Sequence, residues 1–358
     1  IAPYEKMQQE IVDYDADKAH YKAAVYWKNI NELDENLIEE VHENGAKCYA
    51  TGVATPGQMH KASAIGADGV ITGAVGQARI AVKDDYAYIS ENCLYSITVP
   101  KLYDKTTEKK YKNYVLQGMT KVRDFTVVSA YDSSKKKDSI LYVINSKGRL
   151  NRVIRLGIKA HVGGIAYDEQ NDLLWITASN GQVFALDWSK ATSSDKISVS
   201  YKFNPGLYNA KSEHVASFLT IDKNKLYVGS YCEGQSGALN VYSIQELLED
   251  NNTTPKMKYS IPERVQGVAF FRNEEGKRPR ILFTQSAGLK NSNLLISPFV
   301  SSHSDYTVNQ KKIIVPGMVE QPVFSGNELY LLFESSARKY RVSYRIPSDQ
   351  IWVTNYTY

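Results

Sequence analysis

The sequence predicts a mainly β protein, a β-propeller of six or alternatively five blades, preceded by a partial α/β segment. Residues 1–76 alternate short apolar strands with amphipathic helices, whereas residues 77–358 consist of short strands separated by Gly, Asn, Asp and Ser. A repeated segment in the second part returns after 40, 53, 50 and 54 residues, near the length of a four-stranded blade. The 26 tyrosines suit half-buried strand surfaces. We therefore expect two domains that meet at residues 76 and 77.

The composition argues against several classes of protein. A chain of 358 residues favours two domains, and a formal charge of +4 argues against a nucleic-acid-binding protein. The 3 cysteines are far apart and form no zinc-binding pattern, and no apolar run is long enough for a transmembrane segment. The run Lys135–Lys137 is expected to be a solvated loop. Because the sequence starts at Ile1 without a visible signal peptide, we expect a processed or partial product.

The first segment predicts strand, helix, strand, helix and strand in that order. The first helix ends at Gly45 and has Asn29 or Asn31 as its N-cap; Thr55 caps the second, which ends at Gly66. Short connections between such elements predict parallel strands with right-handed crossovers. The expected strands are 22–28, 46–52 and 68–73, and the expected helices are 29–45 and 55–66.

Five segments of the second part align without gaps. Each has valine in second place and is followed by another strand, which marks the innermost strand of a blade. They are "KVRDFTV" from Lys121, "HVGGIAY" from His161, "HVASFLT" from His214, "RVQGVAF" from Arg264 and "MVEQPVF" from Met318. Residues 79–99 resemble a further, less regular blade, which gives six. Ring closure should pair the two ends of this region and remove a free sheet edge.

Either the first or the third position of the repeat should face the mouth of the central channel, where a ring of cationic, imidazole and carboxyl groups could bind an anionic or carbohydrate ligand. In the alternative, these residues satisfy backbone groups and one another. The candidate ligand-binding residues are Lys121, Arg123, His161, His214, Arg264, Gln266 and Glu320. No metal site is expected, since no carboxylate or thiol cluster recurs beside the histidines. Glu334, paired with Arg338 or Lys339, is expected to latch the last blade rather than bind a ligand.

Residues 26–73, ending in "IGADGVITG", resemble the last strand–helix units of a glycerophosphodiester phosphodiesterase, a (β/α)8 TIM barrel. Tyr49–Gly52 departs from the family's Trp-containing string. The family's catalytic and metal-binding residues come from earlier units, which this sequence lacks. The resemblance therefore implies a catalytically incomplete remnant without a cofactor, in which Mg²⁺ or Ca²⁺ would bind only if an upstream barrel half is present. A protein partner or an upstream chain segment would complete the barrel.

The strings "HVGGIAYD", "VQGVAF" and "LYLLFESSARKY" resemble a family of secreted bacterial propeller proteins without a settled activity. This resemblance implies a secreted or cell-surface protein. We expect a binding or structural module that has no phosphodiesterase activity alone, which leaves open whether the protein is an enzyme. The alternative is the C-terminal portion of a metal-dependent glycerophosphodiester phosphodiesterase whose catalytic residues lie upstream of residue 1. A propeller hydrolase with its site at the axis is a third hypothesis.

Overall fold

The computed structural model is mainly β, as predicted, and divides into two compact units, Ile1–Leu94 and Tyr95–Tyr358. Residues 76 and 77, where the sequence places the domain boundary, lie outside the part that is described. The structure describes residues 25–73, 86–99, 111, 113–178, 181–191, 197, 199–209, 212–213, 216–272, 279–341, 343, 348 and 350–356.

The first unit contains the parallel three-stranded sheet that the sequence predicts, in the order β1-β2-β3. Its helices place Ile38 and Met59 in one apolar core with Ala50 of the sheet, because apolar residues recur at helical spacing. Short helix α5 (Ala87–Asn92) follows. The sheet and its helices are β1 (Val25–Asn29), α2 (Glu35–Glu43), β2 (Lys47–Thr51), α3 (Pro56–Ala64) and β3 (Gly69–Val70).

The N-cap of α3 is the predicted residue, whereas the N-cap of α2 is not. Thr55 caps α3 in a capping box with Gln58, as predicted. The cap of α2 is Asp34, whose side chain accepts the Leu37 N–H at 2.9 Å, rather than Asn29 or Asn31. Asn29 instead accepts the backbone N–H of Asn31 at 3.0 Å and closes a turn before the helix.

Asp68 of the Gly-Ala-Asp-Gly turn joins β2 and α2. Its carboxylate accepts the backbone N–H of Cys48 at 2.7 Å and contacts Nε2 of His42 at 2.8 Å. The Cys48 N–H, with His42 and Lys47, holds the pKa of Asp68 below its usual range although burial opposes this. The turn therefore has a structural role in this unit. His60 is exposed on α3.

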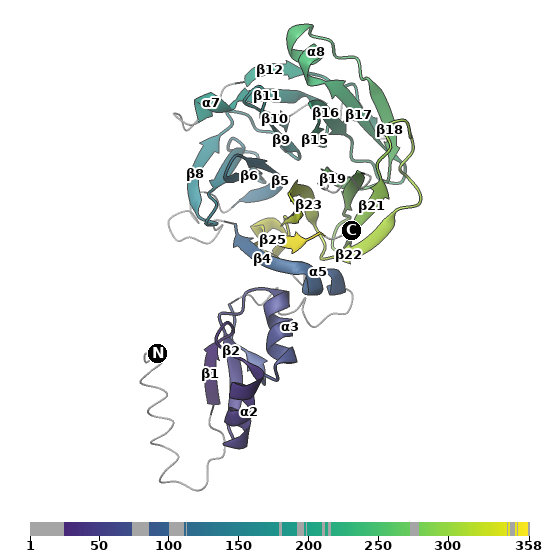
Figure 1. Ribbon diagram of the computed structural model, residues 1–358. Helices are drawn as coiled ribbons and strands as arrows, with labels where there is room; N and C mark the ends of the chain where they lie inside the picture. The colour runs from purple at the N-terminus through teal and green to yellow at the C-terminus, as the bar shows by residue number, and fades with distance from the viewer. Residues whose placement is uncertain are drawn as a thin grey trace. The chain divides into compact units, whose positions relative to one another are not determined.

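The second unit contains five four-stranded sheets within its described residues, arranged as the blades of a propeller (Figure 1). Neighbouring strands run antiparallel wherever their register is described.

Blade 1 is β5 (Tyr114–Val122), β6 (Phe125–Asp132), β7 (Ile140–Ile144) and β8 (Leu150–Arg155). Blade 2 is β9 (Ile165–Asp168), β10 (Leu173–Thr177), β11 (Val183–Asp187) and β12 (Val199–Phe203). Blade 3 is β15 (Phe218–Asp222), β16 (Lys225–Gly229), β17 (Gly237–Ser243) and β18 (Met257–Ile261). Blade 4 is β19 (Val265–Phe271), β20 (Arg280–Gln285), β21 (Ser292–Pro298) and β22 (Lys311–Val315). Blade 5 is β23 (Val319–Ser325), β24 (Glu328–Phe333), β25 (Gln350–Asn355) and β4 (Cys93–Thr98).

Blade 5 confirms the predicted ring closure, and it also corrects the blade number. Its outermost strand β4 comes from the start of the region and joins β25 from the end of the chain (Figure 1). The stretch expected to be a sixth blade thus supplies one strand and α5 in its described part, residues 86–99. The alternative of five blades is therefore the one observed.

Few helices interrupt the β region. Helix α8 (Ile244–Glu249) follows β17 and has the Ser243 hydroxyl as its N-cap. Helices α7 (Trp188–Ala191) and α9 (Arg338–Arg341), and the hairpin β13 (Tyr208–Asn209) with β14 (Ser212–Glu213), were not predicted. None of the helices in the described ranges is long and apolar enough to cross a membrane.

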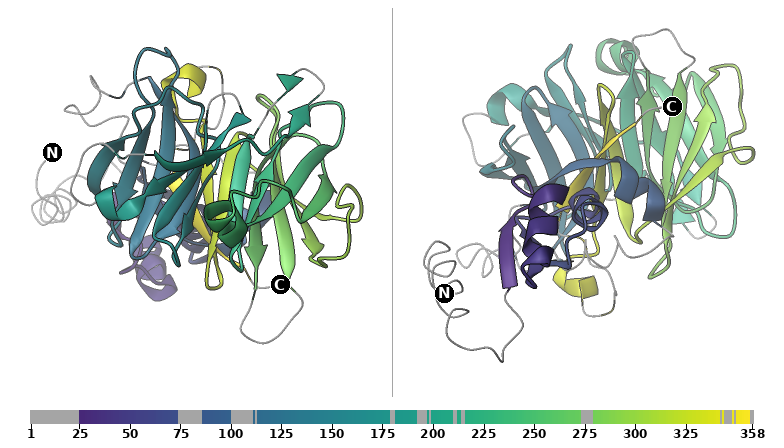
Figure 2. Two further views of the ribbon diagram at one scale, coloured as in Figure 1. Left: turned by 90° about the horizontal axis from the view of Figure 1, so that it is seen from above. Right: turned by 60° about the horizontal axis from the view of Figure 1, so that its bottom comes forward.

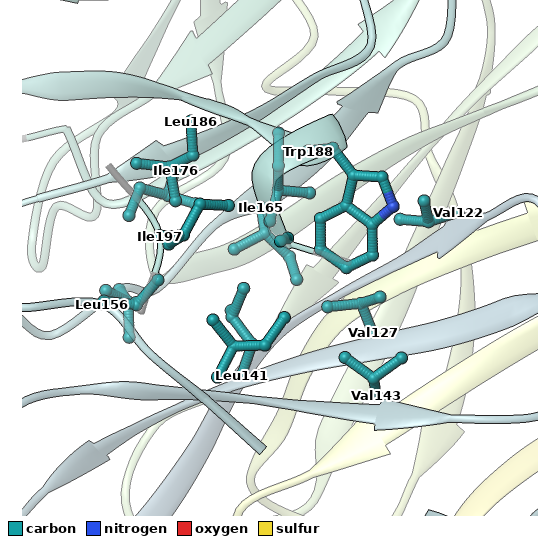
Figure 3. Packing of buried hydrophobic residues seen from close by; sticks show 14 of the residues in the cluster. Val122, Val127, Leu141, Val143, Leu156, Ile165, Ile176, Leu186, Trp188 and Ile197 are labelled. Atoms are coloured by element: carbon teal, nitrogen blue, oxygen red, sulfur yellow. The ribbon is translucent and has the colours of Figure 1, made fainter. Parts of the chain in front are cut away.

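Apolar layers between neighbouring blades hold the ring together. Between blades 1 and 2, Trp188 packs with Val122 and Ile165, and every labelled side chain points into the shared layer (Figure 3). Burial of each such side chain contributes about 1.5–3 kcal/mol. Similar layers join blades 2 to 3, 3 to 4 and 5 to 1. Figure 2 shows the sheets standing side by side around the axis, so the inner strands converge there.

Candidate functional site

The innermost strands of three blades contain a β-bulge near the start of the strand. The register shifts between Leu116 and Met119 in β5, between Val265 and Gly267 in β19, and between Val319 and Pro322 in β23. A bulge bends a strand and redirects one side chain. The bulges contain Gln117, Gln266 and Glu320. These three residues therefore occupy equivalent positions near the start of three inner strands.

The bulges correct the alignment of the first repeat. Val122, placed by sequence with Val265 and Val319, is the last residue of β5, whereas Leu116 occupies the equivalent position. The matching segment is therefore "VLQGMTK", which starts at Val115. Gln117 was missed, although the Gln-Gly pair at 117–118 recurs at 266–267 and is the signal that could have found it.

Lys121 and Arg123 consequently lie at the opposite end of the inner strand. The Lys121 ammonium donates to Thr126 Oγ1 at 3.0 Å and lies over the Tyr330 ring, 4.7 Å from its centroid. Arg123, in the turn from β5 to β6, forms an exposed ion pair of 3.2 Å with Asp172. These two candidates do not belong to the group formed by the other predicted residues.

The remaining predicted residues fall at or near the start of inner strands, except that His214 lies outside the described residues. Arg264 is half-buried and contacts the carboxylates of Glu233 and Glu263 at 3.4 and 3.8 Å. Its backbone has φ +60°, a strained conformation for arginine. Gln266 is half-buried, and Glu320 is buried. The charge of Arg264 is therefore already balanced within the protein.

Gln321 fills the axis at the level of the inner strands. Its amide Nε2 donates to the carbonyls of Ile165 and Leu219 at 2.7 and 3.1 Å, and its Oε1 accepts the Ile165 N–H at 2.9 Å. The Met119 N–H is 3.4 Å from the same Oε1. A methyl group at Gly267 would lie 2.6 Å from the Gln321 Cα. One glutamine of blade 5 thus bonds to the inner strands of blades 1, 2 and 3 and packs closely against that of blade 4, although it was not among the predicted axial residues.

A second group of axial side chains surrounds Glu334, which follows β24. We call this group the axial cluster: Gln117, Tyr131, His161, Glu320, Glu334, Lys339 and Tyr340. Gln117 donates to the Glu334 carboxylate at 2.9 Å, and Tyr340 forms a hydrogen bond with the same carboxyl group. Of the two partners that the sequence suggested, Lys339 contributes an electrostatic attraction, while Arg338 is exposed.

The two carboxyl groups of the axial cluster have raised pKa values. Burial, and then the charge of Glu334, raise the pKa of Glu320 well above its ordinary value. Burial raises the pKa of Glu334 to about 7, although Lys339, Gln117 and Tyr340 oppose this shift. Glu320 is 3% exposed, whereas Glu334 keeps partial access to solvent. Near neutral pH, Glu334 can therefore either accept or donate a proton.

The basic groups of the cluster lie beside aromatic rings. The His161 ring is 4.5 Å from the Tyr131 ring, between centroids, and Lys339 donates to the Tyr131 hydroxyl at 3.2 Å. Protein atoms crowd His161 and lower its pKa to about 4, and Lys339 adds to this shift, although His161 stays accessible to solvent. His161 is therefore a neutral hydrogen-bonding group at physiological pH.

The cluster offers carboxyl, amide, phenol and imidazole groups at one place, with one ammonium group at its rim. Such a set can exchange hydrogen bonds with a hydroxyl-rich ligand and can transfer protons. The described part of the chain contains no group of three or more His, Cys, Asp or Glu residues suited to a metal ion.

Comparison with known proteins assigns the chain to no family. No family model and no curated protein matches the chain. Among solved structures, the crystal structure of a nidogen/laminin complex is similar at 14% sequence identity, with a TM-score of 0.37, over 63% of this chain and 74% of that chain. A likeness of this size supports no inference about function. The five-bladed arrangement accordingly depends on the strand registers described above.

Proposed function

We propose that the propeller is a carbohydrate-binding module and that the axial cluster binds the sugar. The observation that carries the proposal is the Glu334 carboxyl group, which keeps partial access to solvent, accepts a hydrogen bond from Gln117 and has a pKa raised to about 7 by burial. An ionised carboxylate accepts hydrogen bonds from two adjacent sugar hydroxyls, and Gln117 and Tyr340 hold it in one orientation.

The composition of the cluster favours a neutral ligand over the anionic one that the sequence left open. Lys121 and Arg123, two of the predicted cations, lie at the other end of β5, and Arg264 is engaged by Glu233 and Glu263. Two carboxyl groups remain at the centre, with Lys339 at the rim. Glu334, once ionised, repels an anionic ligand and attracts the hydroxyl hydrogens of a neutral sugar.

A screen of immobilised glycans with the labelled protein tests this proposal, followed by calorimetry on the best-bound glycan. Tyr340→Phe removes the hydroxyl that orients Glu334 and should weaken binding about fivefold, the loss of roughly one hydrogen bond. Glu169→Gln, an exposed substitution in the turn between β9 and β10, is the matched control and should leave affinity unchanged. Binding that Tyr340→Phe and Glu169→Gln affect equally would place the sugar elsewhere.

The same carboxyl pair favours a second candidate function, hydrolysis of a glycosidic bond. Acid and base catalysis by one pair requires two carboxyl groups whose environments give them different proton affinities. Glu320 is buried, whereas Glu334 keeps partial access to solvent, so their environments differ. Incubation with the bound glycan and detection of new reducing ends tests this candidate. Turnover that is lost in Glu320→Gln supports it, and an intact glycan rejects it.

For the first unit we propose a remnant of a phosphodiesterase barrel. The parallel order β1-β2-β3 with helices between the strands supports this proposal, since a (β/α)8 barrel ends with such units. The alternative remains the C-terminal portion of an active glycerophosphodiester phosphodiesterase. No hydrolysis of glycerophosphocholine with Mg²⁺ or Ca²⁺ is expected from this chain, and turnover would reject the remnant. A secreted or cell-surface location belongs to the same proposal, and immunodetection on intact cells and in the medium tests it.

A further inference from the structure

The carboxyl group of Glu320 is buried without a hydrogen-bond partner among the described residues. Glu320 lies in the bulge of β23 and is 3% exposed. In the part of the chain that the structure describes, its carboxyl group forms neither a hydrogen bond nor an ion pair, and burial and the charge of Glu334 are what act on it. Nearly all buried polar side chains in proteins have a hydrogen-bond partner. A group of the ligand can therefore be the partner of Glu320.

The strand register places Glu320 beside Glu334. Val319 pairs with Phe333, and the two glutamates are the residues that follow this pair on β23 and after β24. Residues that follow the two members of an antiparallel pair are diagonal neighbours on one face of the sheet. Burial raises the pKa of Tyr340, and the charges of Glu334 and Glu320 add to this shift, so both carboxyl groups lie near the same hydroxyl.

The two carboxyl groups offer different hydrogen-bonding atoms to a ligand. Burial, and then the charge of Glu334, raise the pKa of Glu320 well above its ordinary value, so this group is a neutral acid with an O–H donor. Burial raises the pKa of Glu334 to about 7, and its ionised form only accepts hydrogen bonds. A donor beside an acceptor matches the carbonyl oxygen and the N–H of a secondary amide.

The depth of the two groups favours an amide over a hydroxyl. Glu334 keeps partial access to solvent, whereas Glu320 is 3% exposed. A hydroxyl oxygen is bonded directly to the sugar ring, so the ring itself would have to approach Glu320 closely. The carbonyl oxygen of an acetamido group stands farther from the ring and can reach a deeper donor.

We infer that the axial cluster binds an N-acetylated amino sugar, with Glu320 donating to the acetamido carbonyl and Glu334 accepting the acetamido N–H. This inference rests on the sugar-binding function proposed above and names the class of sugar. An acetamido group is uncharged, which agrees with the preference of the cluster for a neutral ligand. The hydrogen bond to the buried O–H of Glu320 should strengthen binding about tenfold relative to the same sugar with a hydroxyl in place of the amide.

Calorimetric titration with chitotriose and cellotriose tests the inference. The two trimers have the same rings and linkages and differ only in the acetamido or hydroxyl group at C2. The ratio of their affinities therefore isolates the contribution of the amide. The wild type should bind chitotriose about tenfold more tightly than cellotriose.

Two substitutions of Glu320 show whether its donor makes this difference. Glu320→Met removes the donor but keeps an unbranched side chain of similar length, and it should reduce the ratio to less than about twofold. Glu320→Gln keeps an N–H donor at the same place and should hold the ratio above about fivefold. Glu169→Gln, an exposed substitution between β9 and β10, is the control and should leave the ratio unchanged. Circular dichroism shows that each variant is folded.

The inference is overturned if the wild type binds the two trimers equally or binds neither, or if Glu320→Met leaves the ratio unchanged. Its failure is distinct from that of the proposed function. A different sugar that the glycan screen finds, and that Tyr340→Phe binds more weakly, would leave sugar binding at the axial cluster in place without the amide contact. A screen without any bound glycan would reject both.

Discussion

Glu334→Gln is the substitution that most sharply tests the electrostatics of the axial cluster. The pKa of Glu334 is about 7 in the folded protein and its ordinary value is 4.5. Below about pH 4.5 the carboxyl group is protonated in both the folded and the unfolded chain, so stability is fully present. As the pH rises the unfolded chain loses its proton first, and stability falls until about pH 7. Above that pH the group is ionised in both states, and the loss is complete.

The magnitude follows from the displaced pKa. At about 1.4 kcal/mol for each pH unit, a displacement from 4.5 to about 7 corresponds to an upper limit of about 3 kcal/mol. Glutamine imitates the protonated carboxyl group and can still accept the hydrogen bond from Gln117. The variant should therefore match the wild type near pH 4.5 and should be more stable by up to about 3 kcal/mol near pH 8.

Urea unfolding followed by tryptophan fluorescence, at several pH values from about 4.5 to about 8, measures this difference. With an m-value of about 3 kcal/mol/M, the urea midpoints should coincide at low pH and separate by up to about 1 M at high pH. Glu169→Gln, on an exposed turn, controls for the change of net charge. Parallel curves for the wild type and Glu334→Gln would refute the assignment of a raised pKa to Glu334.

Three further substitutions test the packing of the ring. Gln321→Leu leaves the N–H and C=O of Ile165 and the C=O of Leu219 without hydrogen-bond partners. At about 1–3 kcal/mol for each group, the substitution should lower the free energy of unfolding by at least about 3 kcal/mol. A loss below about 1 kcal/mol would contradict the role of Gln321 in joining the inner strands. Gly164→Ala places a methyl group 2.3 Å from the Leu219 backbone N, so blades 2 and 3 must separate. The control Gly206→Ala meets nothing within 4 Å and should lower the free energy of unfolding only by the roughly 1 kcal/mol that its left-handed backbone costs. Equal urea midpoints for the two variants would reject this packing. Arg272 donates to both carboxylate oxygens of Asp222, at 2.7 and 2.5 Å. Arg272→Lys should therefore lower the free energy of unfolding by about 1–2 kcal/mol. If the substitution has no effect even at low salt, the pair does not join blades 3 and 4.

Much of the fold was predictable because the signals were local. The alternation of strands and helices in the first unit and the recurring valine of the inner strands each reflect a buried face, which Val265 and Val319 confirm by being fully buried. Ring closure could be expected because an open sheet edge is unfavourable. The count of six failed because one strand, β4, was interpreted as part of a separate blade, although it completes blade 5.

The site was harder to predict because its residues meet only through the ring. Gln117 contacts Glu334 across 217 residues of sequence, and the misaligned first repeat placed Arg123 where Gln117 belongs. Bulges insert residues into a strand and shift a repeat without changing its apolar pattern. The sequence identified Glu334 as unusual, since a carboxyl group on an apolar strand needs a partner, yet one of its partners, Gln117, comes from another blade.

The most direct test of sugar binding at the axial cluster is the pH dependence of affinity for the best-bound glycan. Sugar hydroxyls that donate to ionised Glu334 lower its pKa in the complex, so the wild type should bind about tenfold more tightly near pH 8 than near pH 5.5. Glu334→Gln cannot ionise, and its affinity should be the same at both pH values. An unchanged affinity in the wild type, an equal pH dependence in Glu334→Gln, or no bound glycan at all would contradict the proposed function.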